Sequence, residues 1–190
     1  MMFPRVTRRP DGAAAIEGLF PLHVEALVEV PDLLEKPEGE AHRRLFPEPS
    51  DDAKHREDWE RLVRPELFAL LASARDILVR DLKGLEPTTP FGPVPRWNVT
   101  VPAQHVNAWI SALNAARLAL GARHGVSTEQ DLRPELVEKD GRIEMDERTF
   151  AIVKINVLAE LQALLILEGL PEGERPPASE EEEGSGEEGA

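Results

Sequence analysis

Residues 102–125 are the stretch that most constrains the fold, because they read as one helix with few polar positions. Pro102 suits the first helical residue, where a missing N–H leaves no bond unmade. Gly125 suits the left-handed residue that closes a helix. At about 100° per residue, one arc of this helix contains Val106, Ile110, Leu113, Arg117, Leu120 and His124, and the opposite side contains Ala108, Ala112, Ala115 and Ala119. Helices that are apolar or small on most sides are typically buried, so we expect the chain to pack around this one.

Arg117 is the one permanent cation in the apolar arc, since a guanidinium does not lose its charge in a protein. It must find a carboxylate or carbonyl oxygens, or extend its head group to water. One interpretation is an ion pair inside the fold, with an acid such as Glu160 as its partner. The alternative is a polar centre that binds a ligand, in which Asn114 and Trp109 would take part. We favour the ion pair, because most buried charges are paired.

A second flank of the same helix carries small polar residues at regular spacing. Asn107, Asn114 and Gly121 recur every seven residues, with Ser111 and Leu118 beside them. This pattern fits either a polar seam against a neighbouring element or a partly solvated helix edge, and we favour the solvated edge.

The segments before this helix predict a small sheet and several helices. Residues 3–9 and 13–19 are expected to form a hairpin about the Pro10–Gly12 turn, because Pro presets φ and Gly permits positive φ. Residues 96–101 alternate in the manner of a half-buried strand and would be the third strand. Residues 87–95, with four prolines, predict a stiff extended loop.

Residues 21–82 are expected to form three helices and one loop. Residues 21–36 predict a helix with a break or kink near Val30, caused by Pro31. Residues 37–49 predict a loop that Leu45 and Phe46 anchor in the core. A helix capped by Ser50 should kink or break briefly at Arg64, because Pro65 disfavours helical dihedrals there. The helix that follows, residues 65–82, should face the core with Leu67, Leu70, Leu71, Ala74, Ile77, Leu78 and Leu82.

The last helix, about residues 147–168, is apolar on two sides and needs two sets of neighbours. One is the core, and the other is either more core or a partner chain. Ile152, Ile155 and Ile166 are therefore a candidate oligomer face, and a homodimer through this helix is one possibility. Polar residues such as Lys154 and Glu160 interrupt the apolar run, so we do not expect it to span a membrane. A turn or small hairpin is expected around residues 136–143.

Composition narrows the classes of function. The net charge is −14, of which residues 171–190, with eight Glu and one Arg, supply −7. These residues should be a disordered acidic tail, and residues 1–170 a single domain. An acidic chain lacks the basic surface that nucleic-acid binding requires. The chain has no cysteine, which excludes disulfides and thiolate chemistry and suits a cytoplasmic protein.

The sequence contains none of the common catalytic or nucleotide-binding motifs. Asp51, His55 and Asp58 have a spacing that can bind a metal ion, but they lie on a charged helix face that is more typical of solvated surface. We therefore expect no catalytic residues, no cofactor and no metal ion.

Residues 105–126, HVNAWISALNAARLALGARHGV, resemble the signature of the uncharacterised DUF2017 family. The matching residues are Ala108, Trp109, Leu113, Asn114, Arg117, Leu118, Ala119, Leu120 and Gly121. The resemblance implies a small, mostly helical domain of unknown activity, and weaker similarity extends over most of residues 2–170. Genes of this family often lie beside the gene for the ClpS adaptor of the Clp protease, which implies a partner by association only.

These observations predict a mainly α protein, a helical bundle around a buried central helix with a small N-terminal hairpin or three-stranded sheet. The function expected is that of a non-enzymatic protein-interaction or regulatory module, with a possible link to Clp-dependent proteolysis. Two alternatives stay open: a ligand-binding module or enzyme with a pocket at Arg117 and Asn114, and a purely structural homo-oligomer.

Overall fold

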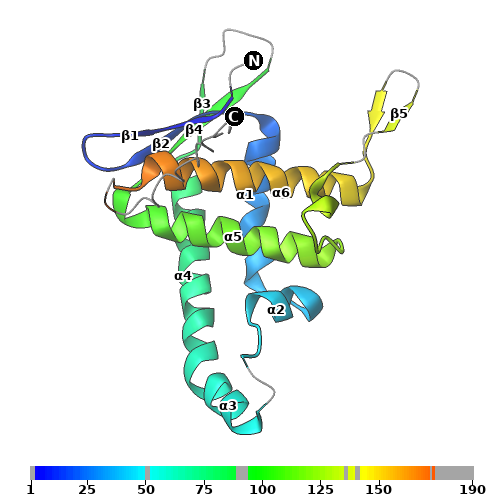
Figure 1. The fold of residues 1–190 in the computed structure, drawn as a ribbon. Coiled ribbons are helices and arrows are strands. Elements are labelled where there is room, and N and C mark those ends of the chain that lie inside the picture. Colours follow the sequence, from blue (N-terminus) through cyan, green and yellow to red (C-terminus); the bar gives the residue numbers. More distant parts are fainter. Residues whose placement is uncertain are drawn as a thin grey trace, which may run out of the picture.

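The computed structural model describes residues 3–49, 52–88, 94–134, 137–139, 142–171 and 173, with the backbone alone for 137–139, 142 and 143. The helices are α1 (Pro21–Glu35), α2 (Gly39–Leu45), α3 (Ala53–Asp58), α4 (Arg64–Leu82), α5 (Val106–Arg123) and α6 (Glu147–Leu164). The strands are β1 (Arg5–Arg8), β2 (Ala14–Leu19), β3 (Glu86–Thr88), β4 (Arg96–Val101), β5 (Val137–Lys139) and β6 (Arg142–Glu144). The predicted acidic tail beyond residue 173 and the predicted cap at Ser50 lie outside the described residues. The protein is mainly α, as predicted (Figure 1).

The central helix is confirmed as α5, which contacts α1, α2, α4 and α6. Trp109, Leu113 and Ala116 on this helix are 0% exposed. Gly125 has a φ of 66° and follows the end of α5, in the left-handed conformation expected of it. The start differs slightly, because Pro102 precedes a single 3-10 turn and the α-helix begins at Val106.

The prediction of a helical bundle around a buried central helix is correct in part, because the helices around α5 form two crossing layers. Figure 1 shows α5 and α6 side by side in opposite directions, with α1 and α4 running across them. Layers of this kind arise because α5 is apolar or small on several sides, so it can contact neighbours in more than one direction. A bundle of near-parallel helices would need one continuous inner stripe on each helix.

The sheet has four strands in the order β1-β2-β4-β3, all antiparallel, where three were predicted. The added strand, β3, ends in the segment predicted as a proline-rich loop, and its Pro87 pairs with Trp97 of β4. Proline is tolerated at this position because β3 is an edge strand, where one side of the backbone needs no hydrogen bond. The small hairpin expected near residue 140 is present as β5 paired with β6.

Two helical predictions require correction. Of the break or kink predicted at Pro31, the break is wrong, because helix α1 continues through Pro31. The burial of Val30, Leu33 and Leu34, at most 3% exposed, offsets the lost backbone hydrogen bond. The segment predicted as a loop at residues 37–49 contains α2. The predicted anchor Phe46, directly after α2, is buried at 4% exposure.

Helices α3 and α4 are joined by a π-helical turn, Trp59–Val63, so a widened turn in a continuous helical path stands where a kink or short break was expected. Such turns accommodate the carbonyl that Pro65 cannot hydrogen-bond. Residues 53–70, which we call the arm, project from the body of the molecule (Figure 1). The predicted inward stripe of α4 is correct at Ala74 and Leu78, which are buried, but wrong at Leu67 and Leu70, which are 37% and 67% exposed.

Candidate functional site

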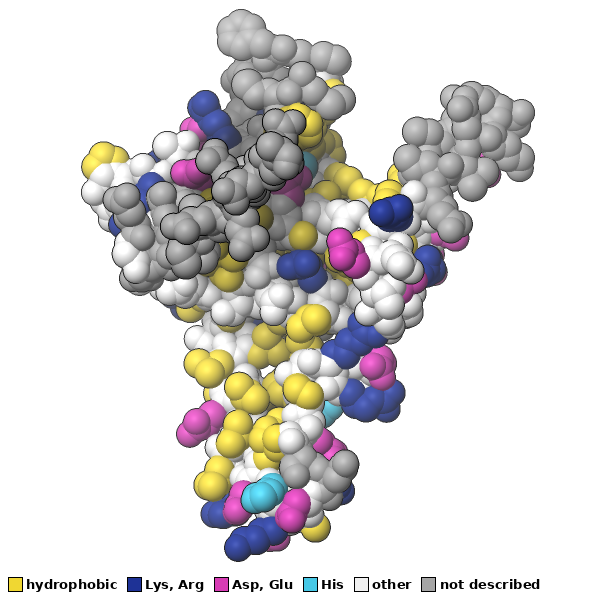
Figure 2. Space-filling model, viewed as in Figure 1, with side chains coloured by type: hydrophobic (Ala, Val, Ile, Leu, Met, Phe, Trp, Pro, Cys, Tyr) yellow, Lys and Arg dark blue, Asp and Glu magenta, His cyan; other side chains and the backbone are white. Residues whose placement is uncertain are grey.

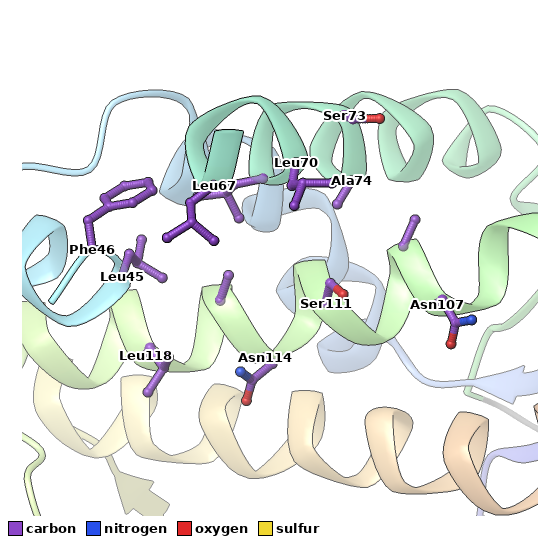
Figure 3. Close-up of a pocket in the computed structure, with 13 residues that line it drawn as sticks. Leu45, Phe46, Leu67, Leu70, Ser73, Ala74, Asn107, Ser111, Asn114 and Leu118 are labelled. Carbon is purple, nitrogen blue, oxygen red and sulfur yellow. The ribbon is translucent and has the colours of Figure 1, made fainter. Parts of the chain in front are cut away.

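A groove of about 460 Å³ lies between α4, α5 and the end of α2 (Figure 3). It is lined by Leu45, Phe46, Leu67, Leu70, Leu71, Ser73, Ala74, Asn107, Ala108, Ser111, Asn114, Ala115 and Leu118. None of these side chains is titratable. The groove can therefore bind a molecule but offers no acid, base or metal ligand from its walls.

One wall of the groove is the polar flank of α5. Asn107, Ser111, Asn114 and Leu118 follow one edge of the helix at a spacing that keeps them on the same side. All four are exposed. The solvated helix edge favoured from the sequence is thus confirmed, and it forms one side of a concave surface.

The other wall is the apolar face of α4 where it leaves the body. Figure 3 shows Leu67 and Leu70 on the side of α4 that faces α5. The same helical stripe buries Ala74 and Leu78 one and two turns further on, where α5 and α1 cover it. On the arm, no element among the described residues covers this stripe in the same way. The apolar stripe of α4 therefore extends beyond the hydrophobic core.

The end of α2 closes the groove. The ring of Phe46 lies 5.8 Å from the ring of Phe68, and Nη2 of Arg64 is 3.0 Å from Nε2 of His42. These two contacts join the arm to the segment around α2. The arm is therefore held at a defined position beside the groove.

The arm carries further apolar side chains outside the groove. In Figure 2, hydrophobic side chains gather along this projecting part of the molecule. Leu62, Val63 and Phe68 are 52%, 43% and 48% exposed. Contiguous exposed apolar surface of this kind is typical of a protein-interaction site.

The structure does not bring Arg117, Asn114 and Trp109 together as one polar centre. Asn114 is exposed in the groove, and Trp109 is fully buried. Arg117 is half-buried and does not line the groove. The sequence could not show that these three residues have different surroundings, because they lie within nine positions of one another on a single helix.

Arg117 is paired with an amide and not with the predicted acid. Its Nη1 donates a hydrogen bond to Oε1 of Gln162 at 2.6 Å, and its buried Nε has no hydrogen-bond partner. Burial lowers the pKa of the guanidinium. Glu160, the suggested partner, lies beside His23 instead, with 3.6 Å between its Oε2 and Nε2 of the histidine.

A buried carboxylate that sequence reasoning missed joins α4 to the start of α5. Asp81 accepts hydrogen bonds from Nδ1 of His105 and from Nε1 of Trp109, each at 2.9 Å. Its side chain is 6% exposed. The three residues provide hydrogen-bond partners for one another's buried polar atoms. This arrangement is structural and holds the C-terminal end of α4 against the start of α5.

A second charged cluster links α1 to α6. Nζ of Lys154 lies 2.9 Å from Glu25 and 2.7 Å from Glu29. Burial acts to lower the pKa of Lys154, but the hydrogen bonds to Glu29 and Glu25 outweigh it and raise the pKa.

His23 is 7% exposed with neither ring nitrogen hydrogen-bonded, and this burial lowers its pKa. Among the described residues, no group of three His, Cys, Asp or Glu side chains could hold a metal ion.

The candidate oligomer face spans α6 and the π-helical turn after it, Leu165–Gly169, and two of its three residues are in the core. Ile152 and Ile155 are 1% and 3% exposed within the single chain, and Ile166 is partly buried against the same core. The second apolar stripe of α6 therefore contacts other elements of its own chain at these positions.

Residues Glu147–Gly169 are long and apolar enough to cross a membrane, by length and composition alone, and an 18-residue window within them has a mean hydropathy of 1.9. The core helix of a globular protein meets the same criteria. Leu158, Leu161 and Leu165 of this stretch are 0% exposed, so packing against the body accounts for its most buried positions.

Comparison with known proteins gives one match. The sequence profile of a family described as "Domain of unknown function (DUF2017)" matches residues 5–168, which is most of the chain. No curated protein and no solved structure matches the sequence or the fold.

Proposed function

The chain belongs to the DUF2017 family, and we propose that it is a non-enzymatic protein-interaction module that docks its partner on the arm and the groove beside it. The observation that supports this proposal is the exposed apolar stripe of α4. Leu67 and Leu70 continue a stripe whose other members are core residues, yet they are 37% and 67% exposed. Burying such side chains gives roughly 25 cal/mol per Å², so a protein that covers them gains affinity.

The chemistry of the groove also favours binding over catalysis. Its α4 side offers leucine and alanine side chains and the hydroxyl of Ser73, and its α5 side offers amide and hydroxyl groups among alanine and leucine side chains. A groove with one apolar wall and one hydrogen-bonding wall matches an amphipathic helix, whose apolar face packs while its polar edge stays hydrogen-bonded. A regulatory role fits a module of this kind. The neighbourhood of ClpS genes that the family resemblance implies makes the Clp system the first place to look for a heterologous partner.

The proposal is tested by photo-crosslinking in cells. A photoreactive amino acid replaces Leu70 in the full chain, and the matched control replaces Val28, which is 56% exposed on α1 and outside the groove. We expect a discrete protein adduct from position 70 and none of the same mass from position 28. Absence of an adduct at position 70, with the chain folded and expressed, contradicts the proposed function.

A further inference from the structure

We propose that the occupant of this docking surface is a second copy of the chain, with the arm of each copy lying in the groove of the other about a two-fold axis near Leu67 and Leu70. This inference names the partner and therefore rests on the proposed function. It places the homodimer on α4, whereas the sequence suggested α6.

The first argument is that one face of the molecule carries both halves of a helix-in-groove contact. The groove accepts a helix with an apolar face, and the arm is such a helix, with Leu62, Val63 and Phe68 between 43% and 52% exposed. A two-fold interface uses the same patch on both copies, so the patch must complement itself. A groove and a projecting apolar helix side by side meet this condition.

The second argument is the size of the exposed patch. Six large apolar side chains, Leu62, Val63, Leu67, Phe68, Leu70 and Leu118, are 37–67% exposed on or beside the arm. They present roughly 500 Å² of apolar surface per chain, at the upper end of what a monomer shows. Two copies would bury roughly 1,000 Å² of apolar surface, which at a typical apolar share of about 60% corresponds to about 1,600 Å² in total, the usual size of a stable interface.

The third argument is charge. The chain carries a net −14, but residues 53–70, the arm, hold four Lys and Arg against four Asp and Glu. Several of these charges are paired within the arm itself, including Arg61 with Asp58 and Arg64 with Glu60. Two acidic molecules repel one another at most of their surface, whereas two arms can approach without a like-charge excess.

The fourth argument excludes the chain's own C-terminal segment as the occupant. Residues 174–190 contain Glu, Gly, Ser, Ala, Pro and Arg and no large apolar side chain, so they cannot fill an apolar groove. The turn before them, Leu165–Gly169, contacts β1 and β2. That sheet lies at the opposite end of the molecule from α3 (Figure 1).

Sedimentation of the full chain tests the inference directly. We expect twice the chain mass at tens of micromolar, and a shift to monomer in Leu70→Asp with an increase in dissociation constant of at least about thirty-fold. Val28→Asp, the matched control on α1, should stay dimeric. Leu62→Asp, also at an exposed position, gives a second disruption should Leu70→Asp fail to fold. A monomer at about 100 µM, or a dimer that survives both arm substitutions, overturns the inference.

The absence of cysteine from the chain permits a second test. Single substitutions Leu67→Cys and Leu70→Cys place one thiol near the proposed axis, and Val28→Cys places one far from it. Under mild oxidation we expect disulfide-linked dimers from at least one arm position and none from position 28. Equal linkage at all three positions indicates random collision and counts against the two-fold contact.

The two proposals fail in different ways. A crosslink in cells from position 70 to a different protein, with a purified chain that is monomeric, sinks the homodimer and leaves the docking function intact. If position 70 gives no adduct in cells and the purified chain is monomeric, both the docking function and the homodimer are wrong.

Discussion

The rings of Phe46 and Phe68 lie with their centroids 5.8 Å apart and their planes 31° from parallel. This contact joins the end of α2 to the arm. Phe46 is 4% exposed and Phe68 48% exposed, so the first is part of the core and the second is part of the surface. The position of the arm, and with it the shape of the groove, depends on this junction.

Phe46→Ala should lower the free energy of unfolding by about 3 kcal/mol, because a buried aromatic ring leaves a cavity. Phe68→Ala, the matched control, should cost about 1 kcal/mol, since half of its ring is already in water. In the Phe46→Ala variant, hydrogen exchange should show that the backbone amides of residues 53–70 lose protection before those of the other residues. Equal costs for the two substitutions in urea denaturation would show that Phe46 does not anchor the arm.

Asp81→Ala should cost about 3 kcal/mol, because it leaves the buried Nε1 of Trp109 and Nδ1 of His105 without an acceptor. Asp81→Asn keeps one acceptor oxygen and should cost about half as much. Urea denaturation measures both. A cost below about 1 kcal/mol for Asp81→Ala would mean that water replaces the carboxylate and that the three residues are not a structural unit.

Gln162→Glu should stabilise the protein by about 1 kcal/mol, because it gives Arg117 the carboxylate that it lacks and converts the bond at Nη1 from one with a neutral acceptor to an ion pair. In an Arg117→Met background the same substitution should destabilise, since the new carboxylate has no cation. The double-mutant cycle measures this coupling. The same effect of Gln162→Glu in both backgrounds would show that residues 117 and 162 do not interact.

Asp131 should control stability in acid. The backbone N–H groups of Ser127 and Thr128 donate to its carboxylate, as does the Thr128 hydroxyl, and with Arg148 they lower its pKa from 3.8 to about 2. A depressed pKa in the folded state contributes stability above the unfolded value, and this contribution is lost as the pH falls from 3.8 to about 2. Wild type should therefore exceed Asp131→Asn in stability at neutral pH, and the gap should close over that range. An NMR titration midpoint for Asp131 at or above 3.8 is the contrary result.

The sequence predicted those elements whose signals are local. Helix α5 has strong helix formers, a proline before it and Gly125 after it, and each signal acts within a few residues. The β1–β2 hairpin and β4 were likewise marked by a turn and by alternation. The edge strand β3 was missed because Pro87 argues against a strand, and only the pairing with Trp97 makes it one.

The site itself depended on contacts that no local pattern contains. Periodicity predicted which face of α4 is apolar, but not that the body ends before Leu67 and Leu70. Asp81 meets Trp109 across 28 residues, and neither residue indicates the other. Arg117 bonds Gln162 and not Glu160 because residues two apart on a helix point about 200° apart, so the choice rested on a rotation of α6 that the sequence does not specify.

Hydroxyl-radical footprinting of Phe68 and Leu70 tests the central claim, that a protein covers the arm, most directly. Labelling of these two side chains is compared between cells, where all partners are present, and the purified chain at high dilution, with Val28 as the internal control. The account predicts a several-fold lower labelling of Phe68 and Leu70 in cells and no change at Val28. Equal labelling of the arm in both conditions would contradict it.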